Sequence, residues 1–143
     1  MKDSIAIAGS ILVDKINEIS AYPEEGELTK ILNVEKSVGG CVPNVAIDIK
    51  KICPDLVVKA VGKIGDDENG EFVRQELAKQ GIDISSISIC QDKTSFTEVS
   101  SVKGGQRTFF TYPGASSKFG YDDVDFDKID VKRYNNIILY DYL

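Results

Sequence analysis

The chain has 143 residues, of which 42% are hydrophobic and 28% are charged, and this is enough for one domain with a hydrophobic core. Its formal net charge of −6 disfavours a protein that binds nucleic-acid phosphates. No apolar run approaches the roughly 20 residues of a membrane helix, and the N-terminus lacks the pattern of a signal peptide.

The cysteines and the lack of histidine limit the chemistry further. Cys41, Cys53 and Cys90 show no CxxC spacing, and there is no histidine, so we expect neither a zinc site nor Ser-His-Asp or Cys-His catalysis. Cys41 precedes a predicted helix, where a thiolate can be activated, but it lacks a basic partner nearby in sequence. We therefore expect reduced thiols, a cytoplasmic location, and no nucleic-acid or membrane partner.

Two kinds of strand are predicted at the start of the chain. Residues 5–8 form a short apolar run that predicts a buried strand. Residues 11–19 and 28–34 alternate between apolar and polar side chains, which predicts half-exposed antiparallel strands. The residues from Tyr22 to Gly26 predict the turn between them.

Helices and buried strands then alternate. A helix after residue 40 should end before Pro54, with one apolar face made by Val45, Ala46, Ile49, Ile52 and Cys53. Residues 56–61 and 87–90 predict two further buried strands. The helix between them should be capped by Asp66 or Asp67, stop at Gly81, and face inward with Phe72, Val73 and Leu77.

The last third begins with a predicted hairpin. Residues 95–102 and 107–112 alternate on either side of a loop that contains Gly104 and Gly105, which predicts a type I′ or II′ turn. One strand should group Phe96, Glu98, Ser100 and Val102, and the other Arg107, Phe109 and Thr111. Residues 122–134 predict a loop with a short helix, and residues 137–140 a last buried strand.

These elements together predict an α/β protein. Buried strands that alternate with helices form a parallel sheet with right-handed crossovers, and the two half-polar hairpins would form a separate small sheet, or lid. Because a buried strand comes almost at the end of the sequence, we expect the chain to be part of a larger α/β domain.

The segment from Ser37 to Ala46 is the most distinctive part of the sequence. Gly39 and Gly40 allow a close backbone approach or a positive φ just before a helix, and Pro43 suits its first turn. Free N–H groups there would favour a polar or anionic ligand, and Asn44 adds an amide. The alternative is a tight strand-to-helix turn without a ligand.

Several motifs in this order resemble the N-terminal half of a carbohydrate kinase of the ribokinase (PfkB) family. The resemblance runs from about Ile5 to Tyr142 and is most specific in the segment from Gly39 to Ala46. The other matching positions are Gly9-Ser10, Asp14, Pro23, Gly26-Glu27, Gly62, Gly65-Asp66-Asp67, Gly70, Gly105 to Phe109, and Pro113-Gly114-Ala115.

The resemblance implies a three-layer α/β/α fold with a mostly parallel sheet and a β-sheet lid. Residues 1–143 would be the N-terminal portion of one carbohydrate-kinase domain, with lid strands at about 11–36 and 95–112. The activity implied is ATP-dependent phosphoryl transfer to a hydroxyl of a sugar or a nucleoside-like molecule, with Mg²⁺. Family members often dimerise through the lid, so the resemblance also implies a homodimer.

The resemblance also implies substrate-binding residues. Asp14 would hydrogen-bond sugar hydroxyls, Gly39 and Gly40 would let the backbone lie against the sugar, and Asn44 would hold another hydroxyl. Glu98 and Arg107 are further candidates, because an arginine can bind an acidic sugar or a phosphate. The alternatives are a solvated Asp14, an Asn44 that only caps the helix, and an exposed polar hairpin surface. Phe96, Phe109 and Phe110 would either shield the sugar or pack a dimer.

One departure from the family pattern matters most. The second family signature, Asp-Thr-x-Gly-Ala-Gly-Asp, which carries the catalytic base and borders the nucleotide site, is absent. We therefore expect no catalytic residue, metal site or ATP site within these residues, and a fragment that is inactive alone. A non-catalytic binding or dimerisation module with the same half-fold is the main alternative. A Rossmann-type binder lacks the required glycine spacing after the first strand. The substrate stays open, although Cys41 stands where related ribokinases often have lysine, which disfavours ribose.

Overall fold

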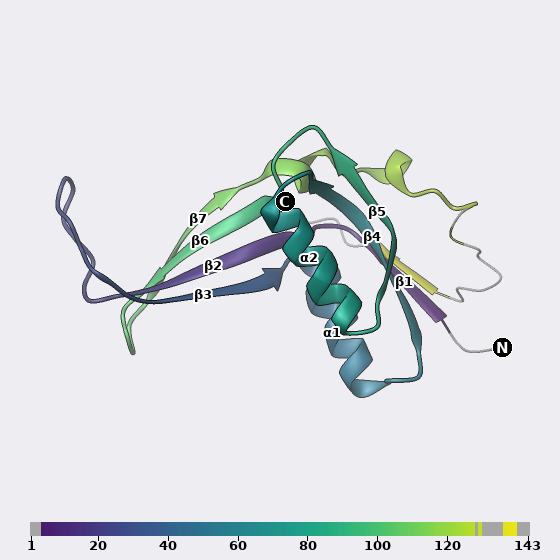
Figure 1. Ribbon diagram of the computed structural model, residues 1–143, viewed down its shortest axis with the longest axis horizontal. Helices are drawn as coiled ribbons and strands as arrows, with labels where there is room; N and C mark the ends of the chain where they lie inside the picture. The colour runs from purple at the N-terminus through teal and green to yellow at the C-terminus, as the bar shows by residue number, and fades with distance from the viewer. Residues whose placement is uncertain (1–3, 128, 130–135, 140–143) are drawn as a thin grey trace.

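The computed structural model describes residues 4–127, 129 and 136–139 and shows two sheets that meet end to end (Figure 1). The main sheet has four parallel strands in the order β5-β4-β1-β8. They are β1 (Ser4–Ala8), β4 (Val57–Gly65), β5 (Asp83–Cys90) and β8 (Asn136–Leu139). The parallel sheet predicted from the sequence is therefore confirmed.

The helices α1 (Cys41–Ile52) and α2 (Glu68–Lys79) cover one face of the main sheet. Their buried side chains pack with those of β1 and β4 into the larger core cluster, which includes Ile7, Ala46, Ile64, Val73 and Leu77. A smaller cluster covers the other face, with contributions from Ala8, Val124 and Ile129. The chain reaches it through the short 3₁₀ helices Gly114–Lys118 and Tyr121–Asp123. In the described residues, α-helices thus cover only one side of the expected three-layer arrangement.

A second sheet projects from the carboxyl end of the main sheet and has the strand order β3-β2-β6-β7 (Figure 1). We call it the projecting sheet; its strands are β2 (Leu12–Ile19), β3 (Ile31–Gly39), β6 (Ser95–Ser101) and β7 (Arg107–Tyr112). The hairpins β2–β3 and β6–β7 are antiparallel, and β2 pairs with β6 in parallel. The separate small sheet predicted from the alternating segments is therefore present.

Strand pairing divides the projecting sheet into two faces. The Asp14 face carries Asp14, Ile16 and Glu18 of β2 together with Glu35, Ser37, Thr97, Val99, Phe109, Arg107 and Thr111 of the other strands. The opposite surface, the Lys15 face, carries Lys15, Asn17, Lys36, Glu98, Ser100, Thr108 and Phe110. Near the main sheet the Lys15 face packs on the helices, since Lys36 Nζ lies 4.5 Å from the ring centroid of Phe72 in α2.

Four local predictions need correction. The third strand begins at Ile31, not at residue 28, and continues to Gly39. Near its start the register with β2 shifts, between Glu18 and Ile19. Strands β4 and β5 are also longer than predicted. The buried side of α1 lies at its N-terminal end, while Ile52 is 79% exposed and Cys53 is exposed.

The turn type is the fourth correction. Gly104 has a φ of 75°, and the N–H of Gly105 donates to the carbonyl of Val102. A positive φ at the third position of this four-residue turn is typical of type II, whereas types I′ and II′ need it at the second position, which Lys103 does not adopt.

No helix in the described part of the chain is long and apolar enough to cross a bilayer.

Candidate functional site

The predicted ligand-binding turn lies where β3 passes into α1, beside the end of β1. Ser10 holds the start of this helix: its Oγ accepts from the N–H of Cys41 at 3.1 Å, and its carbonyl accepts from the N–H of Val42 at 3.1 Å. Pro43 has no N–H, and the N–H of Asn44 donates to the carbonyl of Gly40. The N–H groups of Cys41, Val42 and Asn44 are therefore all bonded within the chain, and the expectation of free N–H groups in the first turn of this helix is wrong.

Gly40 and Gly39 are both required by their surroundings. Gly40 has a φ of 88°, and a Cβ there would lie 2.6 Å from the carbonyl oxygen of Ser10. A Cβ on Gly39 would collide with Oδ2 of Asp14 and would lie 2.8 Å from Cδ1 of Leu12. The carboxylate of Asp14 consequently lies directly against the backbone of Gly39, and the glycine pair and the aspartate form one unit.

Asp14 itself is half-buried and has no hydrogen-bond partner among the described residues. Burial alone raises the pKa of its carboxyl group above the ordinary 3.8. A carboxylate that loses water without gaining a donor is costly, and such groups are commonly found where a ligand supplies the missing hydrogen bonds.

A hydroxyl-lined cavity of about 370 Å³ opens on the Asp14 face, where the projecting sheet meets the main sheet. Its lining includes Ser10, Leu12, Thr97, Thr111, Ser116 and Ser117. Thr97 and Thr111 lie in the same cross-strand row as Asp14, and their Oγ1 atoms are 3.4 Å apart. This volume lies within the range of small-molecule sites.

Serine hydroxyls fix the floor of this cavity. Ser116 Oγ accepts from the N–H of Ile11 at 3.0 Å and donates to the carbonyl of the same residue at 2.6 Å. The N–H of Ser116 in turn donates to Ser95 Oγ at 2.9 Å. These contacts attach the segment after Pro113 to the linker between β1 and β2 and to the start of β6. The cavity is therefore held in place where the two sheets meet.

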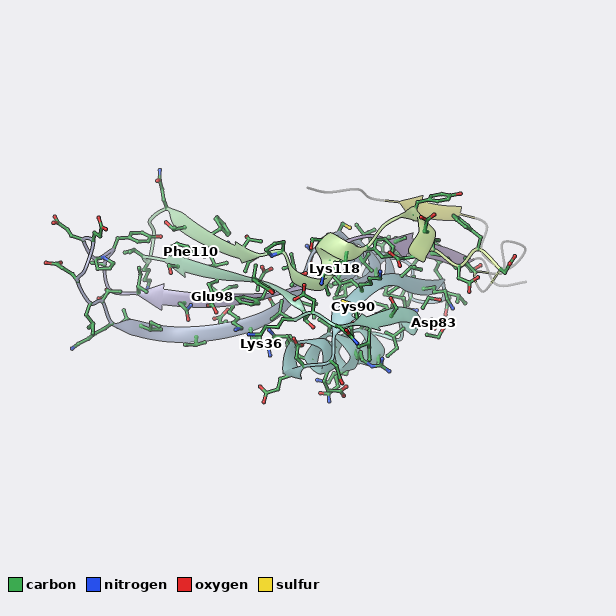
Figure 2. All side chains as sticks on the ribbon, turned by 90° about the horizontal axis from the view of Figure 1, so that it is seen from above. Lys36, Asp83, Cys90, Glu98, Phe110 and Lys118 are labelled. Carbon is green, nitrogen blue, oxygen red and sulfur yellow. The ribbon has the colours of Figure 1, made fainter. Side chains whose placement is uncertain are left out.

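The other predicted substrate-binding residues do not lie together. Asn44 is exposed in the first turns of α1; the helix N-cap is Gly40, so Asn44 does not cap it, and its side chain has no hydrogen-bond partner in the described residues. Glu98 lies on the Lys15 face, 3.3 Å from Lys15 Nζ and 3.1 Å from Asn17 Nδ2. Figure 2 shows Glu98 and Phe110 in the projecting sheet, away from the main sheet. Arg107 lies on the Asp14 face, four residues along β7 from Thr111.

The aromatic candidates also divide between the faces. Phe96 stacks on Tyr112 at a centroid distance of 5.4 Å and lies under Lys15. Phe109 is 59% exposed on the Asp14 face, and Phe110 is 64% exposed on the Lys15 face.

Asp67 is the N-cap of α2, as one of the two predicted alternatives. Its Oδ1 accepts from the N–H of Gly70 at 2.8 Å and from Oγ1 of Thr94, while Oδ2 accepts from the N–H of Thr94. These contacts connect the helix to the segment that enters β6. Although burial opposes the shift, hydrogen bonds from Thr94, Gly70 and Asn69 lower the pKa of Asp67. The described residues contain no group of three or more side chains that could hold a metal ion.

The sequence prediction missed the hydroxyl groups of the cavity. Thr97 and Thr111 appeared only as polar members of alternating strands, and Ser95 and Ser116 had no predicted role. Nothing in the sequence gives the register between β2 and β6, which are more than 70 residues apart and place Thr97 beside Asp14.

Comparison with known proteins agrees with this architecture. The profile of the pfkB family carbohydrate kinases matches residues 2–139. A 5-dehydro-2-deoxygluconokinase of Clostridium perfringens is 32% identical over 106 residues, which cover 71% of this chain and 31% of that protein. A ribokinase of Staphylococcus aureus is 28% identical over 126 residues, covering 87% and 41%.

Solved structures show the same fold. The Arabidopsis thaliana ribokinase complexed with ribose and ATP superposes with a TM-score of 0.82 at 23% identity, over 97% of this chain and 45% of that one. The chain thus spans less than half of the length of each of these relatives. With the family profile matched over almost its whole length, the chain belongs to the pfkB family of carbohydrate kinases.

Proposed function

We propose that this chain binds the acceptor of an ATP-dependent sugar kinase, on the Asp14 face beside the glycine pair. Asp14 accepts hydrogen bonds from the substrate hydroxyls, Gly39 and Gly40 let the substrate lie against the backbone, and Asn44 holds a further hydroxyl. The observation that carries the proposal is the half-buried carboxylate of Asp14, which has no donor in the described residues. It lies in the same cross-strand row as Thr97 and Thr111, which line the cavity.

The chemistry of these groups suits a polyol. A carboxylate accepts two or more hydrogen bonds, and an amide both donates and accepts, so together they match hydroxyls on neighbouring carbons. A substrate hydroxyl that donates to Asp14 replaces the water lost by burial, and hydrogen bonds to a charged group are worth about 1.5–3 kcal/mol. Glu98 is not part of the proposed site, because its carboxylate is already bonded to Lys15 and Asn17 on the other face.

The proposed reaction uses ATP and Mg²⁺, as expected for the family. We place no nucleotide site within the described residues, since the N–H groups at the start of α1, where a phosphate would be held, are bonded to Ser10 and Gly40. We therefore propose that residues 1–143 bind the acceptor without transferring a phosphoryl group. A coupled assay of ATP hydrolysis with a panel of sugars tests this, and turnover by the chain alone would refute it.

Substitution of Asp14 tests the binding site. Sugars and nucleosides are titrated by calorimetry into the wild type, Asp14→Asn and Asp55→Asn. Asp55 is an exposed carboxylate after α1 and serves as the control. We expect Asp14→Asn to weaken binding at least tenfold and Asp55→Asn to leave it unchanged. Equal binding by all three proteins would show that the acceptor does not contact Asp14.

We also propose that two copies associate through the projecting sheet. Its edge strand β7 is exposed throughout. Large apolar side chains are also exposed to solvent on β7, on β3 and on the loop that precedes β3. They are Leu28, Ile31, Leu32, Val34, Phe109 and Phe110, which are 55–88% exposed. An open sheet edge with exposed apolar side chains favours pairing with another chain.

Light scattering after size-exclusion chromatography tests the dimer. Phe110→Glu should shift the chain toward monomer, whereas Tyr121→Glu should not, because Tyr121 is 72% exposed but lies outside the projecting sheet. A wild-type monomer at concentrations up to about 1 mM would contradict the proposal.

A further inference from the structure

We infer that the Asp14 face selects an uncharged polyhydroxy acceptor and discriminates against sugar acids. This inference rests on the proposed function and narrows the substrate class of the same site. It matters because the family relatives include both a kinase named for a sugar acid and a ribokinase, so the resemblance alone does not decide the charge of the acceptor.

The lining of the cavity is made of neutral hydrogen-bonding groups. Ser10, Thr97, Thr111, Ser116 and Ser117 contribute hydroxyls, and Leu12 contributes an apolar side chain. The hydroxyl protons of Ser116 and Ser117 are already donated to backbone carbonyls of this chain, so toward a ligand these oxygens act as acceptors, which suits the hydroxyls of a sugar. A buried carboxylate ligand requires a cation or several donors aimed at it, and the described lining of this cavity contains no lysine or arginine.

The charges on the Asp14 face are unfavourable to an anion. Asp14 lies in the same row as Thr97 and Thr111, next to the cavity, and Glu35 and Glu18 follow along β3 and β2 on the same face. Two like charges about 5 Å apart repel by roughly 1 kcal/mol in water and several-fold more at a partly buried site. A substrate carboxylate beside Asp14 is therefore disfavoured, whereas a hydroxyl is favoured.

Four basic side chains in the described residues are either distant from this site or already paired. Arg107 is on the Asp14 face, but four residues from Thr111 along an extended strand correspond to about 13 Å. Lys15 pairs with Glu98 on the other face. At the end of the main sheet, Lys63 Nζ lies 2.6 Å from Asp123, and Lys118 Nζ lies 2.9 Å from Asp92. Figure 2 shows Lys118 near the junction of the two sheets.

The test compares matched ligands and matched variants. D-glucitol and D-gluconate, which differ at one terminal carbon, are titrated with D-ribose, D-fructose and 2-dehydro-3-deoxy-D-gluconate by ligand-observed NMR. The proteins are the wild type, Thr111→Arg and Thr108→Arg. Thr111 and Thr108 are both exposed on β7, but they lie on opposite faces, so the second variant adds the same charge away from the site.

For the wild type we expect each neutral ligand that binds to do so at least tenfold more tightly than the acids, about 1.4 kcal/mol. Thr111→Arg should reduce this preference at least tenfold, and Thr108→Arg should leave it unchanged. Tighter binding of the acids by the wild type would overturn the inference while leaving the sugar site intact. If none of the five ligands binds, the proposed function fails, and the inference fails with it.

Discussion

The two sheets of this protein differ in how far their apolar side chains are buried. In the main sheet, the side chains of Ile7, Val58, Ala60 and Ile64 are at most 1% exposed, and the packing of the helices accounts for their apolar character. In the projecting sheet, apolar side chains such as Val34, Phe109 and Phe110 are 59–64% exposed. The main sheet is therefore explained by the packing of the chain itself, whereas the projecting sheet leaves apolar side chains uncovered, and it is there that we propose a substrate and a second copy bind.

The two faces of the projecting sheet carry different sets of side chains. Alternation along each strand places Asp14 and the two threonines on one side and the Lys15–Glu98 ion pair on the other. A shift of one residue in the pairing of β2 and β6 would exchange these sets, so the register itself determines the site.

The largest expected contrast between the sheets comes from truncating one side chain in each. Leu77 is 0% exposed in α2, and Leu77→Ala should lower the free energy of unfolding by about 3–4 kcal/mol, through lost burial and the cavity left behind. Phe110→Ala should lower it by less than about 0.5 kcal/mol for the monomer, because the ring is largely exposed. Urea unfolding of both variants measures this contrast, and similar losses would show that the projecting sheet has packing of its own.

The junction between the sheets should be nearly as sensitive. Gly40→Ala requires a residue with a side chain at a φ of 88° and brings its Cβ 2.6 Å from the Ser10 carbonyl, so we expect a loss of about 3 kcal/mol. Gly26→Ala is the control, since Gly26 has a φ of 85° but open space around it. It should cost about 1 kcal/mol. An equal cost for both variants would mean that Ser10 does not constrain the turn.

An ion pair in the main sheet gives a pH-dependent prediction. Lys59 is 6% exposed, and its Nζ lies 2.9 Å from Asp83. Burial by itself would raise the pKa of Asp83, but hydrogen bonds from Ser85 and Lys59 outweigh burial and lower this pKa to about 2. This stabilisation is therefore present above about pH 4, the usual range for aspartate, and is lost as the pH falls toward 2.

Asp83→Asn should cost about 1–2 kcal/mol at pH 7, a figure reduced for the partial exposure of Asp83. The cost should shrink as the pH falls from 4 to 2. Asp48→Asn, which breaks the exposed pair with Lys51, should cost less than about 0.5 kcal/mol at any pH. Unfolding curves at several pH values separate the two, and a pH-independent cost for Asp83→Asn would contradict the account.

The smallest expected effect has the opposite sign. Burial raises the pKa of Asp14, so its ionised form is disfavoured in the folded protein, and stability falls as the pH rises through that pKa. Asp14→Asn should therefore be more stable than the wild type at pH 7, by less than about 1 kcal/mol, and the gain should vanish below about pH 4. A loss of stability at pH 7 would mean that Asp14 supports the fold instead of a ligand.

Local pattern was enough to predict most elements, whereas Asp14 and the glycine pair were named together only through the family resemblance. Short-range periodicity revealed the buried strands, the two helices and the hairpins, because each depends on neighbours within a few residues. It failed where distant contacts decide: the end of α1 protrudes, so Ile52 is exposed, and β3 extends to Gly39 because it pairs with β2 up to Leu12. Lys59 is buried where Asp83 and Ser85, both in another strand, lie within hydrogen-bond distance of its Nζ.

The central claim is that the acceptor lies on the Asp14 face at the junction of the two sheets. A backbone amide NMR map recorded during titration with a sugar that binds tests it most directly. We predict that the largest shifts fall on Asp14, Gly39, Gly40, Thr97 and Thr111. Shifts centred on the Lys15 face, around Asn17, Ser100 and Thr108, would contradict it.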